Sequence, residues 1–218
     1  MGQLIERLAV EKGHEIAAIV NESDPAEAAV EKVRGCDVAI DFTLATAVRG
    51  NVEACLAAGI PLVEGTTGWH DQRSDIQKLV IDARGAFVFG ANFSIGVNLF
   101  YKIAEFSAEL FSKFPEYEGF IEEQHHARKK DAPSGTALKI KDVVSKHVNV
   151  GEIPATRAGN IPGTHRLGFD GPADQILLEH TARSREGFAL GAIIAAEWIV
   201  GKTGFYEFAD VMSEIAGQ

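Results

Sequence analysis

Hydrophobic positions in the first part of the chain switch repeatedly between helical and extended spacing. Residues 3–12 are predicted to form a helix that ends at Gly13, because their apolar positions recur with the period of a helix. The same reasoning predicts helices over residues 46–58 and 70–83, and strands over residues 15–20, 37–42, 61–64 and 86–89. Strands and helices in regular succession indicate an α/β fold, with a parallel sheet covered by helices on both faces.

The pattern changes near residue 95. A long amphipathic helix is expected to end before Pro115, and a Gly- and Pro-rich stretch over residues 152–174 is typical of a long functional loop with short strands. The other expected elements are strands over residues 118–123 and 175–180 and helices over residues 96–114, 134–147 and 187–199. We therefore expect a nucleotide-binding type of domain from residues 1–94 and 186–218, and a second, smaller domain from residues 95–185.

Composition narrows the class of protein. The 218 residues carry a net charge of −10, which argues against nucleic acid as a general partner. No apolar run is long enough to predict a membrane span, and the first residues do not resemble a signal peptide. The two cysteines, Cys36 and Cys55, have no metal-ligand spacing and fit a reduced, cytoplasmic location.

Small and polar residues follow three of the predicted strands. In an open parallel sheet, ligands bind beyond the carboxyl ends of the strands. Ordinary turn chemistry explains any one such loop, but three loops at equivalent places favour a cofactor site. The loops are Asp41-Phe42-Thr43, Gly65-Thr66-Thr67-Gly68 and Gly90-Ala91-Asn92-Phe93-Ser94.

The segment 122–136 carries most of the candidate chemistry. It contains two adjacent imidazoles, His125 and His126, with Lys129 nearby. Imidazole exchanges protons near neutral pH. Ser134-Gly135-Thr136 opens a predicted helix, whose first N–H groups can hold an anion. We interpret the segment as a pocket for a small carboxylate substrate with a proton-transfer step.

The segment also raises two alternatives, a metal site at the His pair and a purely structural role for the two glutamates. Adjacent side chains on a strand point to opposite faces, so His125 and His126 suit a shared metal ion poorly, and no third ligand has a familiar spacing. We therefore expect no metal. Glu122 and Glu123 either orient an imidazole or form a solvated strand edge, and the sequence leaves both readings open.

With these motifs in hand, the chain resembles the dihydrodipicolinate reductase family over its whole length. The most specific part is the His-His pair followed by Asp-Ala-Pro-Ser-Gly-Thr-Ala at residues 131–137. The resemblance implies a Rossmann-like domain that binds NADH or NADPH, and a smaller α+β domain that binds substrate and forms a homotetramer. It also implies reduction of 4-hydroxy-tetrahydrodipicolinate, a step of lysine and diaminopimelate synthesis, in which the hydroxyl leaves as water.

The resemblance also assigns roles to matching residues. It implies that His125 is the catalytic acid/base and that Lys129 is the proton donor. His126, Gly135 and Thr136 are expected to hold the substrate carboxylates, with Ser134 assisting. The nicotinamide end of the cofactor is expected against Gly65, Thr66 and Thr67 and against Gly90, Ala91, Asn92 and Phe93, with Phe42 and Thr43 beside them.

Two expectations concern the start of the chain. Family members begin with a strand and a Gly-rich turn, whereas this chain begins at what resembles the end of that turn; we expect a first strand and its turn, about 10–15 residues, to precede Met1 in the functional protein. After the second strand, Glu22 would disfavour a 2′-phosphate, which favours NADH slightly over NADPH.

Two competing functions remain. A truncated and catalytically impaired relative would act as a small-dicarboxylate binding module, although such a module has little need of His125 and Lys129. A hydrolase that uses the His pair to hold a metal ion is the other, and metal analysis of the purified protein separates it.

Overall fold

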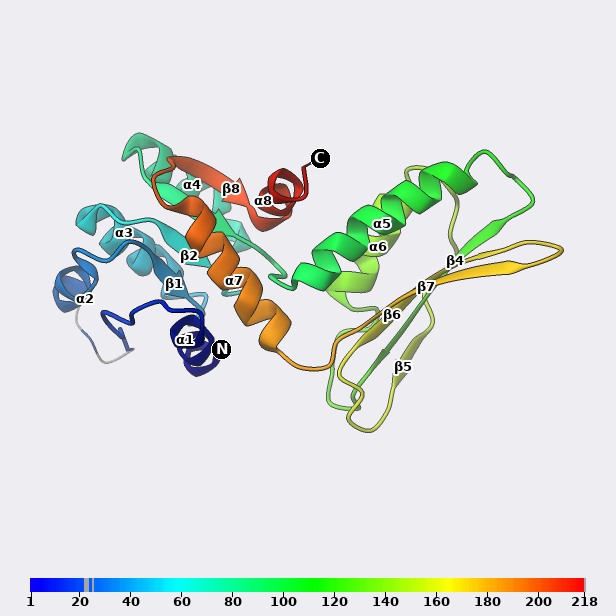
Figure 1. Cartoon of the computed structure of the whole chain (residues 1–218), viewed down its shortest axis with the longest axis horizontal. Helices are drawn as coiled ribbons and strands as arrows, with labels where there is room; N and C mark the ends of the chain where they lie inside the picture. The colour runs from blue at the N-terminus through cyan, green and yellow to red at the C-terminus, as the bar shows by residue number, and fades with distance from the viewer. Residues whose placement is uncertain (22–23, 25, 218) are drawn as a thin grey trace. The chain divides into compact units, whose positions relative to one another are not determined.

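The computed structural model describes residues 1–21, 24 and 26–217, which fold into two compact units. The first unit comprises Met1–Ile95 and Phe188–Gln218, and the second comprises Gly96–Gly187 (Figure 1). Within the described residues, no helix combines the length and hydrophobicity that crossing a membrane requires.

The first unit is built on a parallel sheet, as predicted. Its strands lie in the order β1-β2-β3-β8, and each pair of neighbours is parallel. The bounds are β1 Ala39–Asp41, β2 Leu62–Glu64, β3 Ala86–Phe89 and β8 Gly204–Glu207. Because the strands are parallel, the carboxyl ends of β1, β2 and β3 share one edge, which brings the loops after them together.

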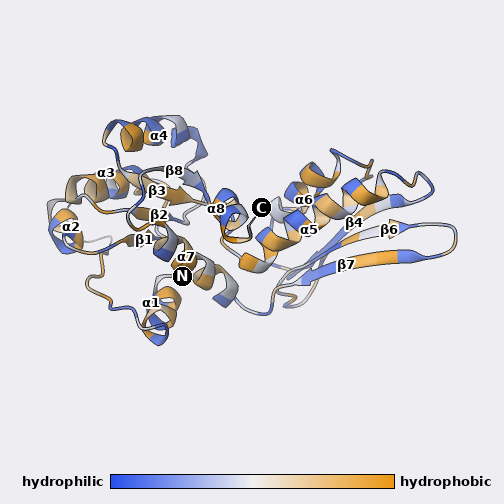
Figure 2. Cartoon of the chain, turned by 45° about the horizontal axis from the view of Figure 1, so that its top comes forward, coloured by the Kyte–Doolittle hydropathy of each residue, from blue (hydrophilic) through white to orange (hydrophobic). Residues whose placement is uncertain are grey.

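Helices cover both faces of this sheet because its strand residues alternate between two apolar cores. Val63 and Val88 face α1, α7 and α8, whereas Leu62 and Phe87 face α2, α3 and α4. Figure 2 shows hydrophobic residues along the strands between these helices. The helices are α1 Gly2–Glu11, α2 Ala26–Val33, α3 Val48–Ala58, α4 Arg73–Asp82 after a short 3-10 turn at His70–Gln72, α7 Glu186–Ile199 and α8 Phe208–Ile215.

The strand predicted over residues 15–20 is wrong. This segment has no strand, and Ile16, Ile19 and Val20 are exposed. A strand needs a hydrogen-bonded neighbour, and the free edge of β1 pairs with no strand among the described residues. The sequence also missed α2, β8 and α8, which are short. Glu22, on which the NADH preference depended, lies outside the described residues.

The second unit is a mixed sheet with two helices on one face (Figure 1). The strands lie in the order β5-β4-β6-β7; β4 is parallel to β5 and antiparallel to β6. The elements are α5 Ile95–Phe111, β4 Glu118–His125, α6 Gly135–Val144, β5 Ala155–Arg157, β6 Thr164–Asp170 and β7 Gln175–Thr181. Phe100 of α5, Ile140 of α6, and Ile121 and Leu167 of the sheet form its core.

Candidate active site

The phase of β4 decides which residues reach the interior of the second unit. Ile121, Glu123 and His125 alternate along the strand and are all buried, whereas Glu122 and Gln124 are not. Side chains two residues apart share one face of a strand. The inward phase set by Ile121 therefore carries Glu123 and His125 under the helices, and the reading of Glu123 as a solvated edge is wrong.

Glu123 is the centre of a cluster drawn from four elements. Its Oε1 accepts a hydrogen bond from the backbone N–H of Ser134 at 2.9 Å and one from the guanidinium of Arg157 at 2.6 Å. Its Oε2 lies 3.4 Å from Nδ1 of His125 and 3.5 Å from Nε2 of His165. The strand register explains this meeting, because Glu123 is opposite His165 and His125 is opposite Arg157.

The charges in this cluster follow from these partners. Burial works to raise the pKa of Glu123, but the hydrogen bonds from Ser134 and Arg157 outweigh it, so the pKa is lowered. Burial lowers the pKa of His125; the Glu123 carboxylate opposes this shift and the Lys129 ammonium adds to it. Burial and the neighbouring His125 lower the pKa of His165 to about 4. At neutral pH the cluster therefore holds an ionised Glu123 between two neutral imidazoles.

The first turn of α6 lies directly beside Glu123. Ser134 is its N-cap residue, and its Oγ accepts a hydrogen bond from the N–H of Ala137 at 3.2 Å. That Oγ also lies 3.1 Å from Nε2 of His165. A methyl group on Gly135 would meet nothing within 4 Å, so space is open over the turn. The predicted carboxylate-binding residues therefore start a capped helix with an open first turn.

The remaining candidates follow β4 in the chain. Lys129 is part-exposed, and its Nζ donates a hydrogen bond to Oδ1 of Asp131 at 2.8 Å. Nδ1 of His126 is buried and, among the described residues, has no hydrogen-bond partner. The backbone of Asp131 accepts a hydrogen bond from Arg157, which ties this loop to Glu123. The structure thus brings His125, His126, Lys129 and the start of α6 into one region of the second unit.

Gly163 makes a close approach to the His125 ring. A Cβ built on Gly163 would lie 3.1 Å from Nε2 of His125, and the φ angle of this glycine is +138°. That backbone conformation strongly favours glycine. Because residue 163 is a glycine, no side chain from this position presses against Nε2 of His125.

The sequence missed His165 and Arg157. With Glu123 and His125, His165 offers a set of three possible metal ligands whose atoms lie within 4.8 Å of one another. This set is different from the adjacent His125 and His126 pair considered from the sequence. A strand predicted over residues 164–170 could have revealed His165, because the register of that strand with β4 places His165 opposite Glu123.

The three strand-end loops of the first unit are also brought together. The N–H of Thr43 donates to Oγ1 of Thr66 at 3.0 Å, and the Phe42 and Phe93 rings meet edge to face at 5.8 Å between centroids. Trp69 donates from its indole nitrogen to the carbonyl oxygen of Thr66 at 2.9 Å.

The tips of these loops are open to a ligand. Thr43, Thr67 and Ala91 are exposed at their tips, so a ligand can reach small side chains and hydroxyls. A methyl group on Gly65 would collide with the Phe42 ring, and one on Gly90 would lie 3.2 Å from Phe93. Glycine at these two positions thus lets the aromatic rings pack under the loops.

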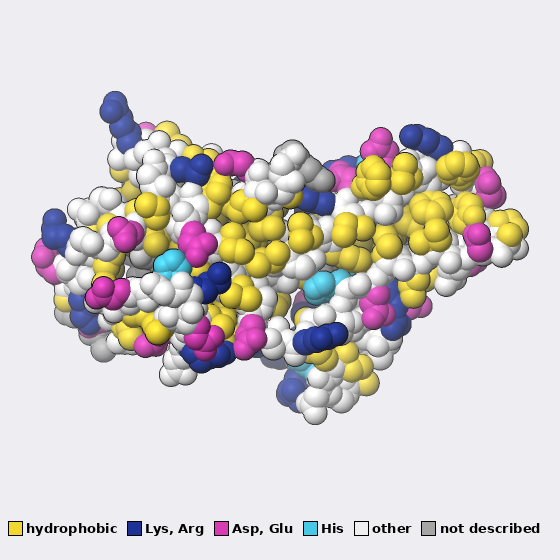
Figure 3. Space-filling model, in the orientation of Figure 1, with side chains coloured by type: hydrophobic (Ala, Val, Ile, Leu, Met, Phe, Trp, Pro, Cys, Tyr) yellow, Lys and Arg dark blue, Asp and Glu magenta, His cyan; other side chains and the backbone are white. Residues whose placement is uncertain are grey.

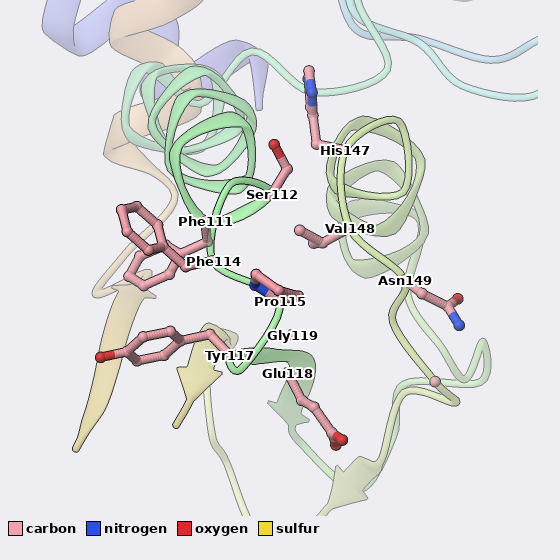
Figure 4. A pocket seen from close by; sticks show the side chains of 11 residues that line it. Phe111, Ser112, Phe114, Pro115, Tyr117, Glu118, Gly119, His147, Val148 and Asn149 are labelled. Atoms are coloured by element: carbon pink, nitrogen blue, oxygen red, sulfur yellow. The ribbon is translucent and has the colours of Figure 1, made fainter. Parts of the chain in front are cut away.

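A separate cavity of about 500 Å³ lies where β4 begins, at the opposite end of this strand from His125 (Figure 4). Its lining comes from the end of α5, the start of β4 and the segment after α6, and includes Phe111, Tyr117, Glu118 and His147. None of the predicted site residues lines it, so it is not part of the candidate active site.

The chain was compared with protein families and with known proteins. The profile "Dihydrodipicolinate reductase, N-terminus" matches residues 1–93, and "Dihydrodipicolinate reductase, C-terminus" matches residues 96–212. A protein of Christiangramia forsetii named 4-hydroxy-tetrahydrodipicolinate reductase is 37% identical over 99% of this chain and 95% of its own length. A protein of the same name from Methanococcoides burtonii is 40% identical over 83% of this chain and 74% of its own length.

The fold has a solved counterpart. The dipicolinate-bound dihydrodipicolinate reductase of Paenisporosarcina sp. TG-14 covers 96% of this chain, which covers 94% of that protein, with a TM-score of 0.77 and 21% sequence identity. At that identity the likeness supports the fold: a Rossmann-like parallel sheet with a second, mixed-sheet unit.

Proposed function

Because the chain belongs to the dihydrodipicolinate reductase family, we propose that it reduces 4-hydroxy-tetrahydrodipicolinate to tetrahydrodipicolinate in lysine and diaminopimelate synthesis. The observation that carries the proposal is the cluster around Glu123, whose carboxylate lies 3.4 Å from Nδ1 of His125 and accepts a hydrogen bond from the N–H of Ser134, the N-cap residue of α6. NADH or NADPH supplies the hydride when bound. The first unit is the dinucleotide-binding domain, and the second is the substrate and oligomerisation domain.

The proposed substrate site is the start of α6. N–H groups of a first helical turn favour an anion, and the turn is open at Gly135. We assign Gly135 and Thr136 to one substrate carboxylate, with Ser134 fixing the turn through its cap and its contact with Glu123. His126 serves the dicarboxylate as well. The solved relative carries dipicolinate, itself an aromatic dicarboxylate.

The proton chemistry belongs to Lys129 and His125. Hydride addition to the conjugated ring leaves negative charge that an acid must quench, while the departing hydroxyl needs a proton to leave as water. Lys129 is the proton donor, since its ammonium is charged and part-exposed. His125 is neutral at pH 7 because its pKa is lowered by burial, so it takes part by accepting and returning a proton. Oε2 of Glu123 lies 3.4 Å from Nδ1 of this ring, and we assign the proton exchange to Nε2.

The proposed cofactor site lies in the first unit. Phe42, Thr43, Gly65, Thr66 and Thr67 form one side of this site. The loop Gly90-Ala91-Asn92-Phe93 forms the other, held by a hydrogen bond from the N–H of Ser94 to Oδ1 of Asn92 at 2.8 Å. NADH is the slightly favoured cofactor, on the acidic character of Glu22 alone.

The reaction is proposed to need no metal. A metal ion held by Oε2 of Glu123, His125 and His165 would lie close to the Arg157 guanidinium, which already bonds Oε1 of the same carboxylate, and the two positive charges would repel each other. Incubation with a chelator should leave turnover unchanged. Loss of activity on chelation, restored by one divalent metal, would revive the metal-dependent alternative.

The proposed assembly is a homotetramer in the cytoplasm, with no nucleic acid or membrane partner. Exposed apolar side chains gather along α5, where Figure 3 shows a continuous hydrophobic surface, and they recur on β7 at Ile176 and Leu177. Exposed apolar patches of this kind mark association surfaces. Sedimentation at micromolar concentration should give a species of four chains; a stable monomer would exclude the tetramer.

A spectrophotometric assay tests the function. The protein is mixed with freshly generated 4-hydroxy-tetrahydrodipicolinate and either NADH or NADPH, and loss of the reduced cofactor is followed. His125→Ala and Lys129→Ala should each lower kcat/KM by about 10²- to 10⁴-fold, whereas Lys139→Ala, an exposed lysine on α6, should match the wild type. If the wild type consumes no reduced cofactor, the reductase function is excluded. Dicarboxylate binding without turnover would support the binding-module alternative.

A further inference from the structure

Two acidic side chains lie side by side beneath the cofactor loops of the first unit. Asp41 ends β1 and Glu64 ends β2, and the register of the parallel strands pairs them directly. They are 6% and 0% exposed. One oxygen of each is satisfied: Asn51 donates to Oδ2 of Asp41 at 2.6 Å, and the N–H of Thr66 donates to Oε1 of Glu64 at 2.6 Å.

The second oxygen of each carboxyl group can be satisfied by the other carboxyl group. Oδ1 of Asp41 and Oε2 of Glu64 are buried, and neither has a donor among the described residues. Two ionised carboxylates can only accept hydrogen bonds, so they cannot satisfy one another. A single proton turns one of them into a donor and satisfies both oxygens at once.

That proton would also close a ring of hydrogen bonds between two cofactor loops. Asn51 bonds Asp41 and lies 3.3 Å from Oγ1 of Thr43, the N–H of Thr43 donates to Oγ1 of Thr66, and the N–H of Thr66 donates to Glu64. The one missing link is the contact between Glu64 and Asp41. Closed networks in a buried setting fix their members in place.

We propose that Asp41 and Glu64 share one proton, and that this acid pair positions the Thr43 and Thr66 loops for the dinucleotide. The proposal rests on the proposed function, because it names positioning residues for the same cofactor site. Glu64 acts through Thr66, and Asp41 through Asn51 and Thr43.

The electrostatic surroundings support the proton. Burial and the neighbouring Asp41 raise the pKa of Glu64 to about 9. The Cys55 thiol of α3 also faces the pair, and its pKa is raised to about 12 by burial, then by Asp41 and Glu64. Like the pair itself, this thiol is an acid and adds no positive charge. A dinucleotide carries negative phosphates, so a pair with one negative charge repels it less than a pair with two.

Glu64→Gln is the informative variant. Its amide nitrogen can donate to Oδ1 of Asp41 in place of the proton, and its amide oxygen can still accept from Thr66, but the side chain cannot ionise. Glu53→Gln is the matched control, because Glu53 is an exposed glutamate of α3 that pairs with Arg49.

The test measures the affinity for NADH and for NADPH in the full chain from pH 7 to 10. One unit above the Glu64 pKa, only about a tenth of the molecules keep the shared proton, so Kd for the wild type and for Glu53→Gln should rise about tenfold relative to Glu64→Gln. Kd values that change in parallel in the three proteins would overturn the inference while leaving the reductase in place. Absence of dinucleotide binding in the wild type would instead overturn the cofactor site itself, and the positioning role with it.

Unfolding supplies a readout that needs no cofactor. The folded state keeps the Glu64 proton up to a higher pH than the unfolded chain, so this group stabilises fully below about pH 4, and the effect is lost as the pH rises to about 9. Trp69 and Trp198 both lie in the first unit, so tryptophan fluorescence follows its unfolding. Wild type should lose stability relative to Glu64→Gln across that range. Parallel stability curves would overturn the shared proton.

Discussion

Two buried glutamates, one in each unit, occupy similar positions and take opposite charge states. Glu64 and Glu123 both lie on strands next to candidate ligand-binding turns, and neither side chain is exposed. Burial works to raise the pKa of both. For Glu64 the next largest cause is the neighbouring Asp41, and the pKa rises to about 9. For Glu123 the hydrogen bonds from Ser134 and Arg157 reverse the shift.

Burial works in the same direction on both glutamates, so the opposite shifts come from their partners: Asp41 adds to the rise at Glu64, whereas Ser134 and Arg157 reverse it at Glu123. An ionised Glu123 beside His125 suits a unit that must orient an imidazole and anchor the first turn of α6. A protonated Glu64 suits the proposed role of the first unit, since an anionic dinucleotide would meet less repulsion there. One residue type thus serves two electrostatic tasks in the same chain.

The largest expected loss of stability comes from neutralising Glu123, the buried glutamate of the second unit. Glu123→Gln leaves Arg157 without its anion, and Arg157 is mostly buried, so we expect a loss of about 3 kcal/mol in the free energy of unfolding. Glu64→Gln should instead raise the free energy of unfolding at pH 7, because the wild type takes up a proton at Glu64 on folding and glutamine does not. Urea unfolding followed by circular dichroism measures both. Equal losses in the two variants would break the comparison.

Acid should weaken the second unit through His165. Its folded pKa of about 4 lies below that of the unfolded chain, so the folded state binds fewer protons and stability is lost as the pH falls from about 6.5 to about 4. The loss attributable to this group is at most about 3 kcal/mol. His165→Gln should flatten that part of the stability curve, measured by urea unfolding at successive pH values. An unchanged slope in the variant would show that His165 is not held neutral.

A smaller effect is expected at Gly163. Gly163→Ala places a methyl group against Nε2 of His125 and strains a backbone with φ of +138°, which should cost about 1–2 kcal/mol of stability. It should also lower kcat more than it changes KM, because the imidazole moves while the start of α6 does not. Gly135→Ala, at an open position of that helix, is the control for stability. A Gly163→Ala enzyme with wild-type kcat would show that the approach to His125 has no catalytic consequence.

The fold was predictable where local pattern and tertiary setting agree. The helix before Gly59 ends at a left-handed glycine, and the helix after Ser134 begins at an N-cap hydroxyl. The strand over residues 86–89 follows from the spacing of its apolar residues. The strand predicted over residues 15–20 failed because its apolar run favours a strand, but no strand among the described residues pairs with it.

The candidate site was predictable only where its residues are contiguous. His125, His126, Lys129 and Ser134 stand within ten positions of one another. Arg157 and His165 reach Glu123 through the register of β5 and β6, which no local pattern encodes. The partnership of Asp41 with Glu64 depends in the same way on two strands being neighbours.

Carbon-13 NMR of the glutamate carboxyl groups tests the contrast between the two glutamates most directly. The Glu64 and Glu123 signals are assigned from Glu64→Gln and Glu123→Gln, and both are followed in one titration of the wild type. Glu64 should carry its proton at pH 7 and release it only near pH 9, whereas Glu123 should stay ionised to below the ordinary pKa of a glutamate. Two signals that both report ionised carboxylates at pH 7 would contradict the assignment of opposite charges to Glu64 and Glu123.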